Sequence, residues 1–310
     1  MPWSVDLHVD IGDRPEIPAG LPLVIALTGF TDAGSAVSQV VDALRESVDT
    51  RPVIRFSNDV LLDYRARRPV IAFDQDHLED YRPPRLELAL AHDLIGQEFL
   101  TLTGYEPDFA WDAFVDDVLA LAAELQVASV TWVHAIAMPV PHTRPIGTTV
   151  SGNRAELIEA HSVWRPRTEV PATVGHLLEM RFVERGTPTA SFVLLVPHYL
   201  ADAEYPAAAI RALESITIAS GIALPSETLR EQNLGFLAKV EEQIAANDEL
   251  GTMLENLETR YDQYVQGSSL RATSDDIDEF DLPSADELAA ELERYLATRP
   301  GDDDKRPGRG

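Results

Sequence analysis

The sequence predicts an α/β protein: a three-layer α/β/α domain with a mixed, largely parallel sheet, followed by a C-terminal helical hairpin. From Leu21 to about Leu224, short apolar runs alternate with amphipathic stretches, as expected for helices packed on a sheet. From about Pro225, apolar residues recur at helical spacing. We therefore expect the α/β/α domain over 1–224 and the hairpin over 225–266. An acidic linker, a short helix and a disordered tail follow over 267–310.

Eight apolar runs have the length and composition of β-strands. They are Leu21–Leu27, Pro52–Phe56, Val70–Phe73, Leu86–His92, Glu98–Leu102, Ser129–His134, Leu177–Val183 and Ser191–Pro197. The acidic cluster from Asp74 to Asp80 contains His77 and follows the third run. We interpret this cluster as a solvated loop.

Four amphipathic stretches predict helices within the same domain. They are Gly34–Val48, Asp108–Leu125, Val170–Leu178 and Tyr205–Gly221. The second is the clearest, because Phe114, Val118 and Leu121 form an apolar stripe beside a row of carboxylates. The segment 170–183 fits a helix or a strand throughout, and its pattern does not decide between them.

The C-terminal part predicts two helices that share an apolar seam, interrupted at Asn247-Asp248. Such a seam has to be covered, either by the chain itself or by another chain. We predict a homo-oligomer and take the residues of the seam as interface candidates. These are Leu229, Leu237, Val240, Ile244, Leu254, Leu257 and Tyr261. Further on, Ser284 and Glu287 resemble a capping box for a last helix that ends at Leu296.

Composition and charge argue against several functional classes. A net charge of −27 would repel nucleic acid and anionic membrane surfaces. The chain has no cysteine for disulfides or thiol catalysis, and its eight histidines show no metal-ligand spacing. We therefore expect neither a metal nor a cofactor. Because signal-peptide features and an apolar stretch of roughly 20 residues are both missing, we expect a cytoplasmic protein.

The first predicted strand leads into the turn Gly29-Phe30-Thr31-Asp32-Ala33-Gly34. A glycine turn before a helix presents backbone N–H groups that suit an anion, and Gly29, Thr31, Asp32 and Gly34 are candidates for that site. The turn lacks the Gly-Lys-Ser/Thr of a phosphate loop and the spacing of a dinucleotide fingerprint. The alternative is a structural corner in which Asp32 caps the following helix.

A second candidate site is the proline-rich loop from His134 to Asn153. It follows a predicted strand and so lies where ligands bind in open α/β sheets. Arg144 is a fork donor suited to an anion or carboxylate, and His142 is a candidate acid or base. The other ligand candidates are Thr148, Asn153 and Arg154. The loop is equally compatible with packing on a partner subunit or on the edge of the sheet.

A third candidate site is the segment Val196-Pro197-His198-Tyr199-Leu200, which also follows a predicted strand. Here His198 is a candidate acid or base and Tyr199 a candidate donor. The alternative for His198 is a structural hydrogen bond. The sequence contains no nucleophile elbow, so enzyme activity stays open.

Four segments, taken in order, resemble the proteasome assembly chaperone 2 family. They are the turn at 29–34, "MPVPHTRP", "SGNRAEL" and "VPHYL", and the last three are similar to its actinobacterial branch, whose function is unassigned. The resemblance covers roughly Leu21 to Gln266. It implies a phosphorylase- or hydrolase-like α/β/α domain that self-associates. Because eukaryotic and archaeal relatives assist proteasome assembly, it also implies a proteasome-related protein partner.

Two hypotheses about function follow. The first is a non-enzymatic assembly chaperone or scaffold that acts through protein–protein contacts. The second is a phosphorylase- or hydrolase-like enzyme, or a nucleotide- or anion-binding module, acting on a small metabolite. In the second, Gly29, Thr31 and Arg144 bind an anion while His142 or His198 moves a proton, so these groups have to meet at one pocket.

Overall fold

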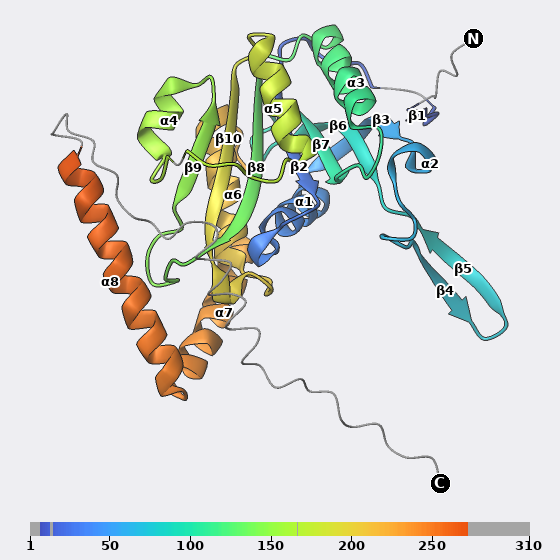
Figure 1. The fold of residues 1–310 in the computed structure, drawn as a ribbon. Helices are drawn as coiled ribbons and strands as arrows, with labels where there is room; N and C mark the ends of the chain where they lie inside the picture. The colour runs from blue at the N-terminus through green and yellow to red at the C-terminus, as the bar shows by residue number, and fades with distance from the viewer. Residues whose placement is uncertain (1–6, 13–14, 166, 272–310) are drawn as a thin grey trace. The chain divides into compact units, whose positions relative to one another are not determined.

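The computed structural model describes residues 7–12, 15–165 and 167–271. The chain divides into two compact units, Met1–Gln263 and Tyr264–Gly310. The first unit contains a mixed sheet with helices on both faces (Figure 1), so the predicted α/β class with added C-terminal helices is confirmed. The domain boundaries predicted after residues 224 and 266 stay predictions.

The main sheet has eight strands in the order β1-β3-β6-β7-β2-β8-β10-β9. In chain order they are β1 His8–Val9, β2 Pro22–Thr28, β3 Asp49–Phe56, β6 Leu86–His92, β7 Glu98–Tyr105, β8 Ser129–Met138, β9 Thr148–Gly152 and β10 Thr189–Pro197. Central strands β7, β2, β8 and β10 run parallel. The other described pairs are antiparallel. The sheet is therefore mixed, as predicted, but its parallel part is confined to the centre.

Strand β2 shows how the sequence builds this centre. Its side chains alternate between two cores, with Val24 and Ala26 in the first and Leu23 and Ile25 in the second, as the two-residue period of a strand requires. All four are at most 2% exposed. Burial on both faces explains why the strand is a continuous apolar run rather than an alternating one.

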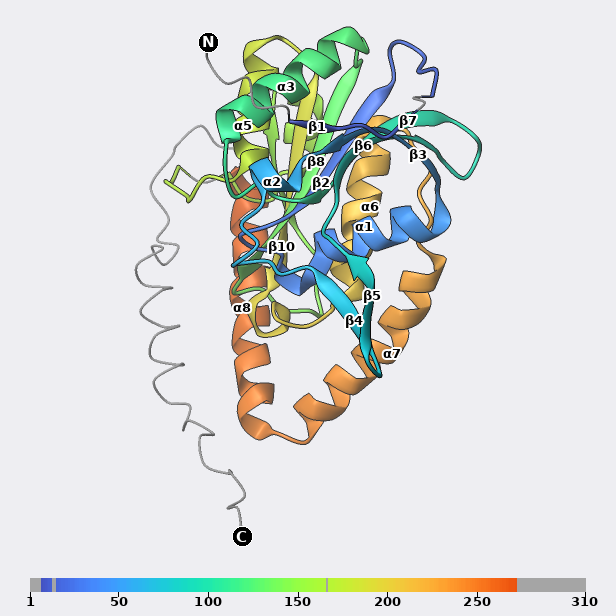
Figure 2. The same cartoon turned by 90° about the vertical axis from the view of Figure 1, so that its right-hand side faces the viewer.

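Helices cover both faces of the sheet (Figure 2). The first core contains residues of α1 (Ala36–Ser47), α6 (Pro206–Ser220) and α7 (Glu227–Ala245). The second core contains residues of α3 (Trp111–Glu124) and α5 (Val174–Glu184). The shorter elements are α2 (Asn58–Leu61), α4 (Ala155–His161) and the 3-10 turns η1 (Ala33–Ser35) and η2 (His198–Leu200).

Helix α5 settles the ambiguity at 170–183. The chain is helical from Val174, and the strand predicted at Leu177–Val183 is wrong. Spaced four residues apart, Val174, Leu178 and Phe182 all lie in the second core. The apolar residues of this segment therefore follow one face of a helix.

The chain itself covers the apolar seam of its C-terminal helices. Leu229, Val240 and Leu257 are buried, and Leu237, Ile244, Leu254 and Tyr261 are half-buried. The α7 members of this set belong to the first core or pack against it. Of the two predicted ways to cover the seam, packing within the chain is seen for these residues, and the interface predicted on them stays a prediction.

Helix α8 (Asp248–Arg271) extends past the predicted start of the acidic linker, so residues 267–271 are helical. The rest of the predicted linker, the helix ending at Leu296 and the tail lie outside the described residues. Within the described part of the chain, no helix combines the length and the apolar character needed to cross a membrane.

A two-stranded hairpin, β4 (Val70–Asp74) and β5 (His77–Arg82), projects from the α/β body between α2 and β6 (Figure 1). The strand predicted at Val70–Phe73 is confirmed. The acidic cluster interpreted as a loop instead forms the turn and the second strand. Every residue of β5 is exposed, and its sequence, HLEDYR, contains no apolar run of the kind that predicts a strand.

The burial of α7 leads to a testable prediction. We expect Val240→Asp to lower the free energy of unfolding by about 3 kcal/mol or more, because it places an unpaired carboxylate in the first core. Leu234→Asp on the same helix is the matched control, since Leu234 is 73% exposed. Urea unfolding followed by circular dichroism measures both variants. Equal losses would contradict the packing of α7 described above.

Candidate functional site

The sheet has a topological switch point between β2 and β7. These two neighbours are parallel, yet β2 continues into α1 on the face of the first core and β7 into α3 on the face of the second. Because the two connections leave opposite faces, a crevice opens beyond the carboxyl ends of the strands. Open α/β sheets bind ligands in crevices of this kind.

A small pocket lies at this crevice, and we call it the switch-point pocket. It has about 10 Å³ of water-accessible volume, room for about one water molecule. Side chains from the turn after β2, the end of β7, strand β8 and the start of α5 line it. The polar and aromatic members are Phe30, Thr31, Glu106, Trp132, His134 and Thr173.

Glu106 supplies the negative charge of the switch-point pocket and is 8% exposed. Its Oε1 accepts the N–H of Val174 at 2.7 Å, and its Oε2 accepts the N–H of Phe30 at 3.2 Å. Val174 is the first residue of α5, so the carboxylate also lies at the positive end of that helix. Gly29 makes room for it, because a Cβ at that position would lie 2.1 Å from Oε2 and 2.6 Å from the Cβ of Glu106.

Two histidines complete this part of the structure. His134 is 7% exposed, and its Nε2 lies 3.0 Å from Thr31 Oγ1. Burial lowers the pKa of His134 from 6.5 to about 4, and the neighbouring His176 contributes to the shift. Burial also lowers the pKa of His176, whose Nδ1 accepts the N–H of Thr173 in the capping box of α5. Both rings are therefore neutral near pH 7, and Glu106 is the charged group among the residues described as lining the pocket.

The glycine turn is a capped corner. Asp32 Oδ1 accepts the N–H of Val37 at 2.7 Å, and Oδ2 accepts the N–H and the hydroxyl of Ser38 at 2.9 and 2.6 Å. The N–H of Gly34 donates to the carbonyl of Ala201 at 2.7 Å. These donors are the ones that an anion would need, so the structure supports the capping alternative and corrects the predicted anion site. Of the candidates in the turn, Gly29 and Thr31 line the switch-point pocket.

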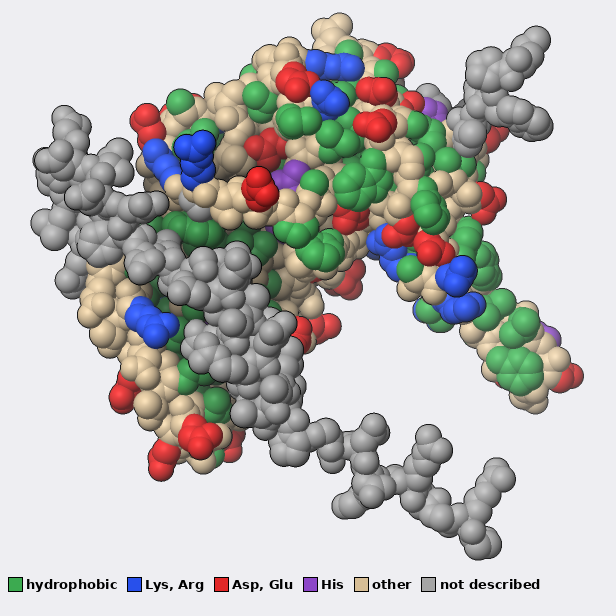
Figure 3. Space-filling view, in the orientation of Figure 1, with side chains coloured by type: hydrophobic (Ala, Val, Ile, Leu, Met, Phe, Trp, Pro, Cys, Tyr) green, Lys and Arg blue, Asp and Glu red, His purple; other side chains and the backbone are tan. Residues whose placement is uncertain are grey.

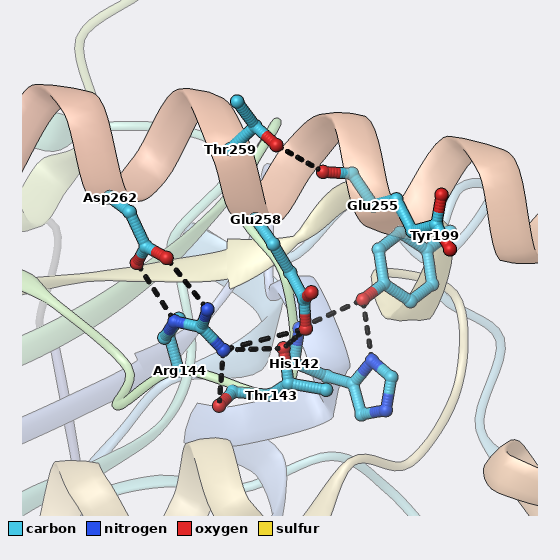
Figure 4. A network of polar contacts seen from close by, with 8 residues as sticks. All are labelled: His142, Thr143, Arg144, Tyr199, Glu255, Glu258, Thr259 and Asp262. Carbon is cyan, nitrogen blue, oxygen red and sulfur yellow. Dashed lines mark hydrogen bonds and ion pairs between the residues drawn. The ribbon is translucent and has the colours of Figure 1, made fainter.

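Arg144 belongs to a second cluster, which we call the α8 clasp: Thr143, Arg144, Glu258 and Asp262 (Figure 4). The guanidinium makes a bidentate contact with Asp262, with Nε and Nη2 at 2.9 and 2.7 Å from the carboxylate oxygens. Thr143 Oγ1 donates to Glu258 at 2.5 Å. Asp262 raises the pKa of Arg144, and Arg144 lowers the pKa of Asp262. The fork donor was correctly recognised in the sequence, but its carboxylate is in the same chain, so the predicted external anion is corrected.

His142 and Tyr199 pack beside this clasp (Figure 4). The Tyr199 hydroxyl accepts the N–H of His142 at 2.8 Å and lies 2.7 Å from its Nδ1. Burial raises the pKa of Tyr199 to about 12, and the exposed His198 ring packs edge-on against it. None of the three lines the switch-point pocket, so the described structure does not bring them together with Gly29 and Thr31 as the enzyme hypothesis requires.

The remaining candidates make structural contacts. The Thr148 hydroxyl donates to the carbonyl of His161. The Asn153 amide donates to the carbonyl of Thr187 and accepts the N–H of Thr189, the first residue of β10. Arg154 contacts Glu156 and the carbonyl of Ala219. The predicted loop is also shorter than expected, because β8 runs to Met138 and β9 begins at Thr148.

Sequence reasoning missed four residues around the switch-point pocket: Glu106, His134, Thr173 and His176. For His134 a signal was present, since it ends the predicted strand Ser129–His134 and begins the proline-rich loop taken as a candidate site. For Glu106, four residues past the end of the predicted strand Glu98–Leu102, the signal was weaker. Thr173 and His176 have the spacing of a capping box. This signal could not be used, because the sequence did not decide whether 170–183 is a helix or a strand.

The fold and the switch-point pocket define an open α/β protein with a small pocket at the switch point of its sheet. The model of the PAC2 family matches residues 26–244 of the chain. Since this match spans more than half of the chain, the protein belongs to the PAC2 family, and the resemblance seen in its sequence segments is confirmed. A comparison with curated proteins found no match.

Solved structures agree with this assignment. A protein of unknown function from Corynebacterium glutamicum is 31% identical, with 83% of this chain and 97% of that one covered at a TM-score of 0.79. Rv2714, a Mycobacterium tuberculosis protein of unknown function, is 36% identical, with 87% and 94% covered at a TM-score of 0.80. The Mycobacterium tuberculosis proteasome-assembly chaperone homologue Rv2125 is 25% identical, with 76% and 100% covered at a TM-score of 0.68.

The capped corner predicts a stability loss. We expect Asp32→Ala to lower the free energy of unfolding by about 1 kcal/mol, because the first N–H groups of α1 lose their carboxylate acceptor. Asp42→Ala, an exposed position on the same helix, controls for the change in charge. Thermal and urea unfolding measure the difference. An Asp32→Ala variant as stable as the control would show that the cap contributes nothing.

The lowered pKa of His134 predicts a pH dependence. The unfolded chain binds this proton below about pH 6.5, whereas the folded chain binds it only below about pH 4. The contribution of the neutral His134 to the free energy of unfolding is therefore fully present above about pH 6.5. It falls by about 3 kcal/mol as the pH drops to 4. We expect His134→Gln to remove this fall, leaving a smaller one from His176. Urea unfolding between pH 4 and 7 tests it, and identical pH profiles for both proteins would contradict the burial of His134.

Proposed function

We propose that this PAC2 protein is an assembly-chaperone-like protein that acts in the cytoplasm through protein–protein contacts and self-association. Family membership and the likeness to a proteasome-assembly chaperone homologue support a chaperone-like role. The observation that carries the self-association is the apolar face of the projecting β4–β5 hairpin.

Four large side chains form this face: Ile71, Phe73, Leu78 and Tyr81, which are 45%, 70%, 61% and 57% exposed. Phe73 and Leu78 are direct cross-strand partners, and Ile71 lies two residues before Phe73 and opposite the bulge that contains Tyr81. The two-residue period of β4 and the bulge in β5 together place them on one side of the hairpin. Figure 3 shows hydrophobic side chains along the projecting hairpin.

An isolated two-stranded hairpin is marginally stable in water. Packing of another protein surface against its apolar face would therefore stabilise this one. The occupant we propose is the hairpin of a second copy. Its tip is acidic, with Asp74, Asp76 and Glu79 exposed, whereas Arg68 and Arg85 are exposed at its base. Opposite charges at the two ends suit a tip-to-base contact between copies, which is self-complementary as a symmetric assembly requires.

Light scattering tests the self-association. We expect the wild-type chain to have a mass of at least two chains of 34.1 kDa each. A Phe73→Ser/Leu78→Ser double variant should shift towards the mass of one chain. Leu234→Ser is the matched control, because it removes a side chain that is 73% exposed elsewhere on the first unit. A wild-type monomer, or a double variant with unchanged mass, would overturn the proposal.

A separate measurement tests the chaperone-like role. Purified proteasome subunits from the organism that encodes the chain should co-sediment with it, and their assembly into core particles should change in rate. Bovine serum albumin at the same concentration controls for crowding. If the subunits neither co-sediment nor change their rate of assembly, a proteasome-related role is excluded, whatever the oligomeric state.

A further inference from the structure

We propose that the switch-point pocket binds the ammonium group of a small organic amine. This site is independent of the hairpin and of the proposed self-association. Its location follows from the topology of the sheet, because the connections that follow β2 and β7 leave opposite faces there. Its chemistry follows from the side chains that line it.

The charge of the lining favours a cation. Glu106 is a carboxylate that is 8% exposed, and its described hydrogen-bond partners are two neutral backbone N–H groups. No lysine or arginine is among the residues described as lining the pocket. Arg67, which is close in space, donates to the backbone carbonyl of Glu106 and to Asp108 rather than to the carboxylate. A buried carboxylate in these surroundings is stabilised by a cationic ligand.

The same lining disfavours an anion. His134 lines the pocket and His176 lies beside it, and burial lowers the pKa of both rings and keeps them uncharged near pH 7. Glu179, which accepts the indole N–H of Trp132, adds a second carboxylate nearby. A phosphate or carboxylate would have to displace the contacts of Glu106 or lie beside its charge. The net charge of −27 adds to this preference, because the field of the whole protein concentrates cations and repels anions.

Size and hydrogen-bonding capacity point to a primary ammonium group. The pocket has room for about one water molecule, and an ammonium head is of similar size. It carries three N–H donors. Each Glu106 oxygen accepts one N–H from the protein and so keeps a further lone pair. When His134 accepts the hydroxyl proton of Thr31 across their 3.0 Å contact, Thr31 Oγ1 also retains lone pairs for a donor.

Two aromatic residues are suited to the body of such an amine. Phe30 follows the end of β2 and is 68% exposed, and Phe109 follows the end of β7 and is 52% exposed. Both therefore lie on the edge of the sheet where the pocket is found. Exposed aromatic rings attract organic cations and apolar groups, so we expect an amine with an apolar or aromatic body.

Three probes that share a phenyl ring and differ in charge test the site by isothermal titration calorimetry: benzylammonium, benzyl alcohol and benzoate. The wild-type chain should bind benzylammonium about tenfold more tightly than benzyl alcohol, because both can donate a hydrogen bond to Glu106 but only the cation also forms an ion pair with its carboxylate. It should not bind benzoate measurably. Binding of benzoate as tight as that of benzylammonium would overturn the proposal. Failure of all three to bind would also overturn it, and would leave a cavity that holds only water.

Variants connect the binding to named groups. Glu106→Gln should weaken benzylammonium binding by about tenfold or more, whereas Glu98→Gln, at the other end of β7, should leave it unchanged. Because Glu106 also supports the fold, Thr31→Val provides a second test that keeps the side-chain shape and removes an acceptor. It should weaken binding severalfold. Unchanged affinity in a folded Glu106→Gln variant, or in Thr31→Val, would overturn the assignment.

Discussion

Glu106 joins segments that lie far apart in the sequence, and the centre of the fold depends on its contacts. Its carboxylate binds the turn after β2 through Phe30 and the start of α5 through Val174. Its own backbone N–H donates to the carbonyl of Thr28 at the end of β2. A buried carboxylate is tolerated only where donors surround it, so these segments are positioned together. The same side chain gives the switch-point pocket both its shape and its negative charge.

The two C-terminal helices are attached to the rest of the first unit by different forces. Helix α7 buries apolar side chains such as Leu229 and Val240 in the first core, an interaction that needs no charge. Helix α8 is held to the loop after β8 partly by the ion pairs of Arg144 with Asp262 and Glu258, which are accessible to solvent. Such pairs contribute little individually and weaken with salt. The attachment of α8 therefore depends on ionic strength in a way that the attachment of α7 does not.

Sequence reasoning succeeded where structure follows from local pattern. Apolar runs located most strands of the sheet, and the stripe at Phe114 located α3. It failed where the outcome depends on a distant partner. Arg144 was recognised as a donor for a carboxylate, but Asp262 lies 118 residues away, and no local pattern connects them. Likewise, the role of Glu106 depends on two backbone N–H groups that only the folded chain brings to it.

The close approach of Gly29 to Glu106 has a consequence for how this family can diverge. A side chain at position 29 would overlap the Cβ of Glu106 as well as its carboxylate, so neither rotation nor a shorter acid relieves the overlap. A larger residue can therefore replace Gly29 only if the end of β7 moves away from the turn. Such a movement would separate the backbone N–H of Glu106 from Thr28 as well. Related chains should accordingly keep glycine at this position even where the residue at position 106 has changed. We therefore expect the glycine also in relatives whose pocket has lost its carboxylate.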